Sequence, residues 1–571
     1  MCVTTRSSTR RWPRRTAPWR ATRVAAQAGR PLGAATTGPE LPCPLSIGNA
    51  SEVTDAKAAS SAPVNDKGTE QDGLRLDWPS VPGGASASTP TRRCLGPAPR
   101  RTRVVATIGP ASDQPATLAA MQEAGMDVAR LPLAHGSIDD AVERLRRIRR
   151  AAPEVGILVD LPGPKIRTTP FPEGGVALLT GSQVVLCPPA LAPRSSADII
   201  GVSVPELVET LQEGDRVALG DGGVALIAEE RDGSSMKVRV IAGGKVQGRP
   251  GVTAPASRLS LTTPTAEDLE RLEVLLEEGI ESVAVSFVRS APDLEAVRAV
   301  TGSSVLVCAK METPEALGHI EEILRVSDTI MVARGDLGVR VALEEVPHIQ
   351  KQLILSAVAW GRPVITATQM LESMINSPVP TRAEVADVAN AVFDGTSAVM
   401  LSGETAIGVD PVCAVATMAR IARRADMEFD SYQWGRNLPA QHFASEGAIG
   451  ARITAAIGAA AWRASVEEKA AVIVACTNTG ATARAIARFR PAAPIVAATP
   501  YPLTARQLTT SWGVDTVLVP EAKSTDEAVN FGVQAVFQGG YVKPGDIVVV
   551  LAGSLHDPEP VTDTLRIVRI Y

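Results

Sequence analysis

The sequence predicts an α/β protein built on a (β/α)8 barrel, with an inserted small β-barrel domain and a C-terminal open α/β domain. Three observations indicate this fold class. Eight short apolar runs alternate with helical segments, about ninety residues of short strands interrupt them, and a different α/β pattern begins near residue 429. Such alternation is typical of parallel strands covered by helices, and a count of eight favours a closed barrel over an open sheet.

The N-terminal segment, 1–100, lacks the periodicity of a folded core. Its first 39 residues contain arginines but no Asp or Glu, and the remainder is rich in Gly, Ser, Pro and Ala. This composition is typical of a disordered tail. An organelle-targeting peptide is the alternative, but it requires an amphipathic helix, which the motif WPRR would break. We expect the folded protein to begin near residue 101.

The barrel is predicted to occupy 101–168 and 262–428. Its strands are expected in the runs RVVATIG, DVARLPL, GILVDLP, ESVAVSFV, SVLVCAKME, TIMVARGDL, PVITATQML and SAVMLSGET. Between the third and fourth runs, 169–261 contains short alternating strands divided by Gly, Asp and Pro, which indicate the inserted β-barrel. Because this domain interrupts a βα loop, we expect it to act as a lid over the C-terminal mouth of the barrel.

The C-terminal domain is predicted over 429–571, where the runs AAVIVACT, APIVAATP, DTVLVP and DIVVVLAG alternate with helical segments. The loop CTNTGATAR joins the first of these strands to a helix. Its N–H groups and hydroxyls are suited to an effector phosphate, although helix capping is the more frequent reason for such a loop. The candidate phosphate-binding residues are Thr477, Thr479, Gly480 and Thr482.

Composition excludes several classes of protein. The formal net charge is −5 and no domain is strongly basic, which argues against a nucleic-acid partner. Seven cysteines without a CxxC pair disfavour a disulfide framework or a structural zinc site and favour a reducing cytoplasm. No apolar run approaches the roughly 18 residues of a membrane span, so we expect no membrane partner.

Charged residues concentrate where the predicted barrel strands end. The carboxyl ends of these strands converge on the face that holds the site in barrel enzymes. A single Glu or Lys there is usually a solvated charge or a helix cap, but here several strands and loops contribute charges to one face. They are Arg130, Lys165, Arg167, Lys310, Glu312 and Asp336.

These residue types indicate phosphoryl transfer. Glu312 and Asp336 follow adjacent strands and carry the oxygen ligands that Mg²⁺ or Mn²⁺ prefers, whereas zinc ligands are nearly absent nearby. Lys310, Arg130 and Arg167 complement an anion that is both phosphorylated and carboxylated. In phosphoryl transfer the metal ion and the cations position the group and balance the charge that moves to its oxygens.

The motifs TIGPAS, AGMDVARL, GPKIRT, VAVSFVRSA and MVARGDLGV, and the long segment from ITATQMLES to GETAIG, resemble those of pyruvate kinase. The resemblance covers about 101–570, and the architecture of that family coincides with the one predicted above. It implies transfer of a phosphoryl group from phosphoenolpyruvate to ADP, giving pyruvate and ATP in the last step of glycolysis. It also implies a homotetramer.

The resemblance implies a role for each matching residue at the mouth. Arg130 would bind the phosphate of phosphoenolpyruvate, and Lys310 would stabilise the phosphoryl group during its transfer. Glu312 and Asp336 would hold the divalent cation.

Further roles implied by the resemblance concern the enolate and the nucleotide. Thr368 would lie beside the enolate that must be protonated, and Arg167 and His135 would face the nucleotide, although His135 fits a helix cap equally well. The backbone groups that would receive the substrate carboxylate belong to Ala333, Arg334 and Gly335.

One departure from the family pattern predicts that K⁺ is not required. Pro132 and Ala134 stand where many members carry an Asn and a Ser that serve a monovalent cation, and Leu161 replaces a hydroxyl residue. Lys165 stands where potassium-dependent members carry Glu. Its ammonium group would supply a fixed positive charge in place of the ion.

Other departures leave alternatives open. Pro250 stands where the family has a lysine that reaches the nucleotide, and the neighbouring Arg249 would compensate. The segment GSLHDPEPVTDTLRI lacks the glycines and basic residues of relatives that bind sugar bisphosphates, which favours a monophosphate effector. A Mg-dependent lyase or decarboxylase acting on pyruvate or oxaloacetate is an alternative activity, because the same groups would stabilise an enolate without ADP. A non-catalytic regulatory paralogue is a third.

Overall fold

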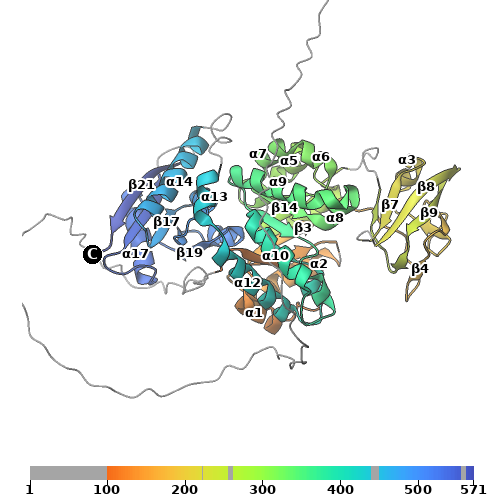
Figure 1. Cartoon of the computed structure of the whole chain (residues 1–571), viewed down its shortest axis with the longest axis horizontal. Coiled ribbons are helices and arrows are strands. Elements are labelled where there is room, and N and C mark those ends of the chain that lie inside the picture. The colour runs from red at the N-terminus through yellow and green to blue at the C-terminus, as the bar shows by residue number, and fades with distance from the viewer. Residues whose placement is uncertain (1–99, 135, 221–222, 255–261, 439–448, 555–560) are drawn as a thin grey trace, which may run out of the picture. The chain divides into compact units, whose positions relative to one another are not determined.

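The computed structural model describes residues 100–134, 136–220, 223–254, 262–438, 449–554 and 561–571. The predicted tail lies outside these ranges except for Arg100. The described residues form a closed eight-stranded barrel, an inserted β region and a C-terminal five-stranded sheet (Figure 1). The predicted fold class is confirmed.

The barrel consists of eight parallel strands. They are β1 (Arg103–Thr107), β2 (Val128–Pro132), β3 (Gly156–Leu161), β12 (Ser282–Val285), β13 (Leu306–Met311), β14 (Thr329–Ala333), β15 (Val364–Ala367) and β16 (Ala398–Leu401). They pair in the closed order β1-β16-β15-β14-β13-β12-β3-β2. The insertion therefore separates β3 from β12 in the sequence but not in space, because these two strands are hydrogen-bonded neighbours.

Helices follow the barrel strands along the chain. They are α1 (Pro115–Ala124), α2 (Ile138–Ala151), α4 (Ala266–Glu277), α5 (Ala291–Thr301), α6 (Pro314–Gly318), α7 (Ile320–Val326), α8 (Arg334–Arg340), α9 (Val346–Ala359), α10 (Arg382–Asp394), α11 (Gly403–Ala406) and α12 (Pro411–Glu428). Side-chain caps fix where several of them begin; for example, Thr265 and Asp268 form a capping box at the start of α4.

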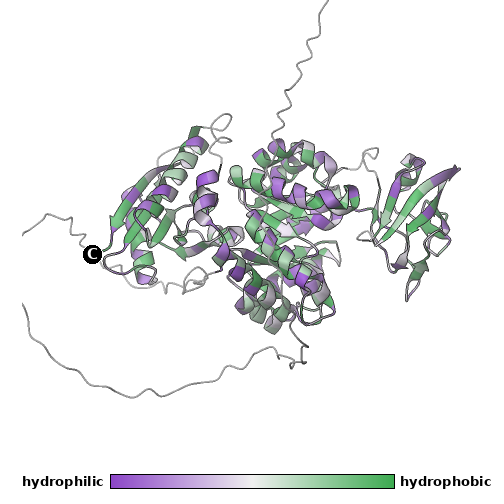
Figure 2. Cartoon of the chain, viewed as in Figure 1, coloured by the Kyte–Doolittle hydropathy of each residue, from purple (hydrophilic) through white to green (hydrophobic). Residues whose placement is uncertain are grey.

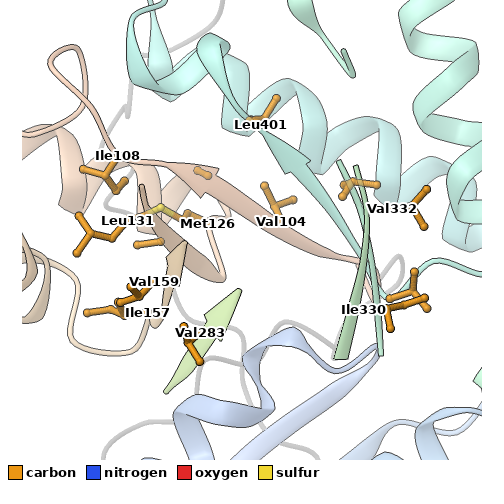
Figure 3. Close-up of a cluster of buried hydrophobic side chains, with 14 of the residues drawn as sticks. Val104, Ile108, Met126, Leu131, Ile157, Val159, Val283, Ile330, Val332 and Leu401 are labelled. Carbon is orange, nitrogen blue, oxygen red and sulfur yellow. The ribbon is translucent and has the colours of Figure 1, made fainter. Parts of the chain in front are cut away.

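Alternation along the barrel strands creates two cores, because neighbouring residues face opposite sides of a sheet. One set, which includes Val104 and Ile330, packs with helix residues in the larger cluster (Figure 3). The other set, which includes Val105, Leu158 and Cys308, forms a separate cluster inside the barrel. Hydrophobic residues accordingly run along the strands (Figure 2). The inward-facing set turns polar at the carboxyl ends of the strands, and these residues form the site.

The insertion folds around its own apolar core. Its elements are β4 (Val176–Leu178), β5 (Gln183–Cys187), β6 (Ile199–Gly201), α3 (Pro205–Thr210), β7 (Arg216–Leu219), β8 (Val224–Asp232), β9 (Ser235–Ala242), β10 (Gly244–Val246) and β11 (Val252–Thr253). Six strands form a sheet in the order β11-β7-β8-β9-β5-β6, and β10 pairs with β4. Isolated bridges from Arg167 to Gly251 and from Thr168 to Val202 lie beside the two edges of the six-stranded sheet; closure into the predicted small β-barrel stays a prediction.

The C-terminal domain is an open sheet with an apolar core on each face. Its elements are α13 (Ser431–Asn437), α14 (Ile449–Glu467), β17 (Val472–Cys476), α15 (Ala481–Ala487), β18 (Ile495–Thr499), α16 (Pro502–Gln507), β19 (Val514–Leu518), α17 (Thr525–Gln538), β20 (Ile547–Gly553) and β21 (Thr562–Arg569). Strands β19, β18, β17 and β20 are parallel, and β21 is antiparallel at the edge. No helix in the described residues is long and apolar enough to cross a membrane.

Buried polar contacts join this domain to the end of the barrel opposite the mouth. Arg103, at the start of β1, donates from Nε to the carbonyl oxygen of Ser511 at 3.1 Å. Glu281, just before β12, accepts a hydrogen bond from Arg506 Nε at 2.7 Å. The C-terminal domain therefore contacts the amino ends of the strands and leaves their carboxyl ends open.

Candidate active site

Four side chains from three barrel strands form one network at the carboxyl ends. Arg130 lies on β2, Asp160 on β3 and Lys310 on β13, and Glu312 follows β13 directly. The Asp160 carboxylate accepts a hydrogen bond from Arg130 Nε at 2.7 Å and lies 3.4 Å from Lys310 Nζ. Lys310 Nζ also lies 3.6 Å from Glu312 Oε2. The structure therefore brings the candidates Arg130, Lys310 and Glu312 together, with Asp160 between two of them.

Three members of this site were not predicted from the sequence. They are Asp160, Ser286, whose Oγ accepts a hydrogen bond from Lys310 Nζ at 2.6 Å, and Thr107, whose Oγ1 accepts one from Arg130 Nη1 at 2.9 Å. A signal for Asp160 was present, because a carboxylate inside the apolar run GILVDLP must be paired when it is buried. Ser286 and Thr107 carry no such signal, since small hydroxyl residues are ordinary at strand ends.

Mutual attraction keeps Asp160 and Lys310 charged. Asp160 is 3% exposed, and burial alone would raise its pKa, but the charges of Lys310 and Arg130 outweigh burial and lower the pKa. Burial also opposes the charge on Lys310, yet Asp160 and Glu312 outweigh it and raise the pKa of the ammonium group. A fixed positive charge therefore stands at the mouth near neutral pH.

Glu312 is the least compensated charge in the network. It is 0% exposed; its Oε1 accepts a hydrogen bond from the Phe287 N–H at 2.7 Å, whereas Oε2 accepts none in the described structure. Burial raises the pKa of Glu312 to about 7; the charge of Lys310 opposes this rise and repulsion from Asp336 adds to it. An orphaned carboxylate oxygen beside a second carboxylate fits a divalent cation, which would neutralise both.

Asp336 lies in the first turn of α8 and is partly exposed. No group of three His, Cys, Asp or Glu side chains within the described ranges could hold a metal ion by itself. Mg²⁺ commonly takes one or two carboxylates and completes its shell with waters and substrate oxygens. Glu312 and Asp336 thus fit a cation that binds together with an anionic substrate.

Thr368 adopts a strained backbone directly after β15. Its φ is +68°, a left-handed value that is unfavourable for a β-branched residue. Its Oγ1 donates to the carbonyl oxygen of Ala367 at 2.6 Å and accepts from the Gly335 N–H at 2.8 Å. Such outliers persist where the surrounding structure holds them and are frequent at functional sites. The hydroxyl of Thr368 is therefore fixed against the first turn of α8.

The side chain of Arg334 has a structural role. The buried guanidinium donates to both carboxylate oxygens of Asp387 on α10, at 2.8 and 2.7 Å, and to the carbonyl oxygen of Thr368 at 2.6 Å. It thereby holds the loop after β15 in place. Only backbone groups at Ala333, Arg334 and Gly335 remain for the predicted carboxylate contact, and the Gly335 N–H would have to leave Thr368 to make it.

Lys165 and Arg167 do not join the charge network. Lys165 is exposed, and its Cε and Nζ lie beside Gly251 of the insertion. Arg167 donates from its backbone N–H to Ser203 Oγ at 3.0 Å and from Nη1 to the carbonyl oxygen of Arg249 at 3.3 Å, which places it with the insertion. A cavity of about 200 Å³ nevertheless has both Lys165 and Asp336 in its wall. His135 lies outside the described residues.

The predicted effector loop borders a larger cavity in the C-terminal domain. This cavity measures about 570 Å³, and Thr477, Thr479 and Thr482 contribute to its wall. Two of the three hydroxyls already have partners, since Thr477 Oγ1 accepts from the Gly480 N–H at 2.9 Å and Thr482 Oγ1 lies 2.7 Å from Thr562 Oγ1. These contacts fit the capping interpretation, and phosphate binding beside the cavity stays a prediction.

The fold and the mouth together define a class of protein. A (β/α)8 barrel carries, at the carboxyl ends of its strands, a buried lysine and an arginine beside a carboxylate pair suited to a divalent cation. This combination is typical of barrel enzymes that act on phosphorylated or carboxylated anions with metal assistance.

Comparison with known proteins identifies the family. Residues 99–415 match the pyruvate kinase barrel domain, and residues 455–568 match the pyruvate kinase alpha/beta domain. The chain is 41% identical to Pyruvate kinase 2 of Synechocystis sp. over 82% of its own length and 79% of the relative. It is 40% identical to pyruvate kinase of Geobacillus stearothermophilus, covering 80% and 78%, and 38% identical to that of Mycobacterium tuberculosis, covering 82% and 98%.

The chain belongs to the pyruvate kinase family. It is therefore an enzyme of the phosphotransferase class, and the family resemblance found in its motifs is confirmed.

The metal site can be tested by binding, without turnover. We expect Glu312→Gln and Asp336→Asn each to weaken Mn²⁺ binding to the substrate-free protein by at least about tenfold, because each removes a charged oxygen ligand. Electron paramagnetic resonance of free Mn²⁺ measures this affinity. Glu344→Gln, at an exposed position after α8, is the control and should bind Mn²⁺ as the unmodified protein does. Equal Mn²⁺ affinity in all variants would contradict a metal site at Glu312 and Asp336.

Proposed function

We propose that the protein transfers the phosphoryl group of phosphoenolpyruvate to ADP, giving pyruvate and ATP in the cytoplasm. The observation that carries this proposal is the buried Lys310 ammonium, held between Asp160 and Glu312 and hydrogen-bonded to Ser286. A preorganised cation at this position would stabilise negative charge on a phosphoryl group in transit without reorganising during the reaction.

Arg130 would bind the phosphate of the substrate. Its Nε is engaged by Asp160 and its Nη1 by Thr107, which fixes the plane of the guanidinium. The side chain is 18% exposed, and no contact of Nη2 is found within the described part of the chain. This nitrogen would donate to a phosphate oxygen at the mouth, while Asp160 holds the rest of the group in place.

A divalent cation held by Glu312 and Asp336 would supply charge neutralisation to the substrate oxygens. In the reaction the P–O bond to the enol oxygen breaks, and a bond forms from a β-phosphate oxygen of ADP to the same phosphorus. The enolate left behind takes a proton at its terminal carbon. The hydroxyl of Thr368 would deliver this proton, either directly or through a water molecule, because its Oγ1 is fixed beside Gly335.

Arg167 and the insertion would contact ADP. The guanidinium of Arg167 is anchored to the carbonyl oxygen of Arg249, and the two arginines together place positive charge on the insertion beside the barrel. His135 is assigned to the nucleotide on the family resemblance alone.

Lys310→Met tests the role of the ammonium group. We expect pyruvate formation to fall by roughly a hundredfold to a thousandfold or more, because methionine keeps most of the side-chain length and removes the charge. A coupled assay of pyruvate release with phosphoenolpyruvate, Mg²⁺ and ADP measures this, with the melting temperature as a check on folding. Lys351→Met, on α9 and largely exposed, is the control and should retain activity.

The same assay separates the candidate functions. Release from phosphoenolpyruvate that depends on ADP supports the kinase, and release from oxaloacetate without ADP supports the lyase or decarboxylase. The absence of release from a folded protein that still binds phosphoenolpyruvate supports the regulatory paralogue. Lys310→Met turnover within tenfold of the unmodified enzyme would contradict the catalytic role of the ammonium group.

We also propose that activity does not require K⁺. Asp160 is already balanced by Arg130 and Lys310, so it offers no spare charge to a monovalent cation. Pro132 and Ala134 supply no side-chain oxygen in the neighbouring segment. Lys165 would bring its ammonium toward the mouth when substrates bind.

The K⁺ proposal is tested in buffers whose only monovalent cation is tetramethylammonium. We expect added KCl to change the turnover less than about twofold in the unmodified enzyme. In Lys165→Glu a negative charge replaces the ammonium group. Activity of this variant should depend on added KCl, because the positive charge near the mouth must then come from K⁺. Strong stimulation of the unmodified enzyme by KCl would contradict the proposal.

A monophosphate effector is proposed for the cavity beside the loop from Thr477 to Thr482. Lys523 and Glu521 are the charged residues in its described wall, which offers less positive charge than a bisphosphate needs. We expect ribose 5-phosphate or AMP to lower the KM for phosphoenolpyruvate, and Thr479→Ala to weaken this response while basal turnover persists. If the effector lowers the KM of Thr479→Ala as much as that of the unmodified enzyme, this cavity is excluded as the effector site.

A further inference from the structure

A cluster of arginines lies at the end of the barrel away from the mouth, where the C-terminal domain contacts it. Four arginine side chains line one small cavity there, together with Ser511 and Trp512. The arginines are Arg362, Arg484, Arg488 and Arg490. The cavity measures about 20 Å³, which is room for about one small ion or water molecule. This cluster has no part in the proposed reaction.

Arg490 is the most deeply buried member of the cluster, with 1% of its surface exposed. Its Nη2 donates to the carbonyl oxygen of Thr396 at 2.5 Å, and its guanidinium lies 4.8 to 5.3 Å from the ring centres of Phe429, Trp434 and Trp512. Its Nη1 has no hydrogen-bond partner in the described structure. Burial lowers the pKa of Arg490 to about 9, with a partial offset from Asp426. The aromatic rings therefore stabilise the cation without neutralising it.

Arg484 is a second arginine of the cluster with one nitrogen on a carbonyl oxygen and another without a partner among the described residues. Its Nη2 donates to the carbonyl oxygen of Thr479 at 3.1 Å, while its Nη1 has no partner in the described part of the chain. Burial lowers the pKa of Arg484 to about 10. Arg362 similarly donates to the carbonyl oxygen of Leu324 at 3.1 Å. The hydrogen bonds that these arginines donate thus go to neutral carbonyl groups, and the charge of Asp328 only partly offsets the effect of burial on the pKa of Arg362 and Arg484.

The nearest carboxylates are already committed to other donors. Asp328 pairs with Arg298 and accepts from the Val307 N–H at 2.9 Å. Asp426 accepts from the N–H groups of Arg101 and Thr102 at 2.8 Å each. Within the described residues, none of Arg362, Arg484 and Arg490 forms a salt bridge. The cavity consequently carries excess positive charge.

Two neutral groups beside the cavity also lack a hydrogen-bond partner within the described ranges. The Ser511 Oγ and the Trp512 Nε1 are buried, line the same cavity and have no hydrogen-bond partner in the described structure. Together with the Nη1 atoms of Arg484 and Arg490, they make four unpaired polar groups, three of which can only donate. A water molecule must also donate its own two hydrogens, whereas an anion accepts from every side. The chemistry of the lining therefore favours an anion over water.

We propose that this cavity binds one small monovalent anion of the size of chloride. The anion would accept hydrogen bonds from Arg484, Arg490, Ser511 and Trp512 and would balance charge that the neighbouring carboxylates leave uncompensated. The four donors belong to the C-terminal domain, whereas Arg362 and Ser397 of the barrel also line the cavity, so the bound anion would lie where the two domains meet. Phosphate esters are excluded by the volume.

Thermal unfolding of the substrate-free full chain tests the proposal. Sodium chloride is exchanged for sodium gluconate at constant ionic strength, since gluconate is too large for the cavity. We expect the melting temperature to rise with chloride and to saturate, by roughly 1 to 4 °C in total. Ser511→Ala and Trp512→Phe should each lose at least about half of this rise, because each removes a donor and keeps most of the packing.

Matched controls and a direct observation complete the test. Ser465→Ala and Trp462→Phe replace residues of the same types on α14 that do not line the cavity, and they should show the full chloride response. Crystals soaked in bromide should give an anomalous peak among Arg484, Arg490 and Trp512. The proposal is overturned if all variants respond equally to chloride, or if the cavity holds only water in bromide-soaked crystals.

Discussion

The catalytic end of this barrel depends on one buried carboxylate, Asp160. It accepts a hydrogen bond from Arg130 and lies within ion-pair distance of Lys310, so two cations from different strands are held by one anion. Removing one partner of a buried pair typically costs about 3–5 kcal/mol, because the remaining charges are left uncompensated in a medium that solvates them poorly. The positions of Arg130 and Lys310 are therefore set together.

The remaining charge balance leaves the mouth suited to a divalent cation and an anionic substrate. Lys310 is shared between Asp160 and Glu312, and one oxygen of Glu312 lacks a hydrogen-bond donor in the described structure. With Asp336 nearby, the mouth carries an acidic excess next to fixed cations. A divalent cation would remove that excess, and an anionic substrate would then meet a site whose dipoles and charges already point toward it.

The cations at the two ends of the barrel have different partners. At the mouth, Arg130 and Lys310 are paired with carboxylates, so their charge is retained and directed toward the site. At the opposite end, Arg484 and Arg490 donate to carbonyl groups, Arg490 also lies over aromatic rings, and unpaired donors line a cavity of the size of one ion. This contrast separates the charge network at the mouth from the arginine cluster where the C-terminal domain contacts the barrel.

The sequence by itself determined the barrel, the inserted β region, the C-terminal sheet and most of the charged mouth. These follow from periodicity and strand parity, which are local: Lys310 and Glu312 share a face because they are two residues apart at the end of one strand. Tertiary structure alone decided which charges meet. Asp160 lies about 150 residues from Lys310 in the chain, Lys165 and Arg167 lie with the insertion rather than in the network, and the orphaned donors of the arginine cluster come from two separate segments. Pairing and burial are properties of neighbours in space, and no spacing within the chain encodes them.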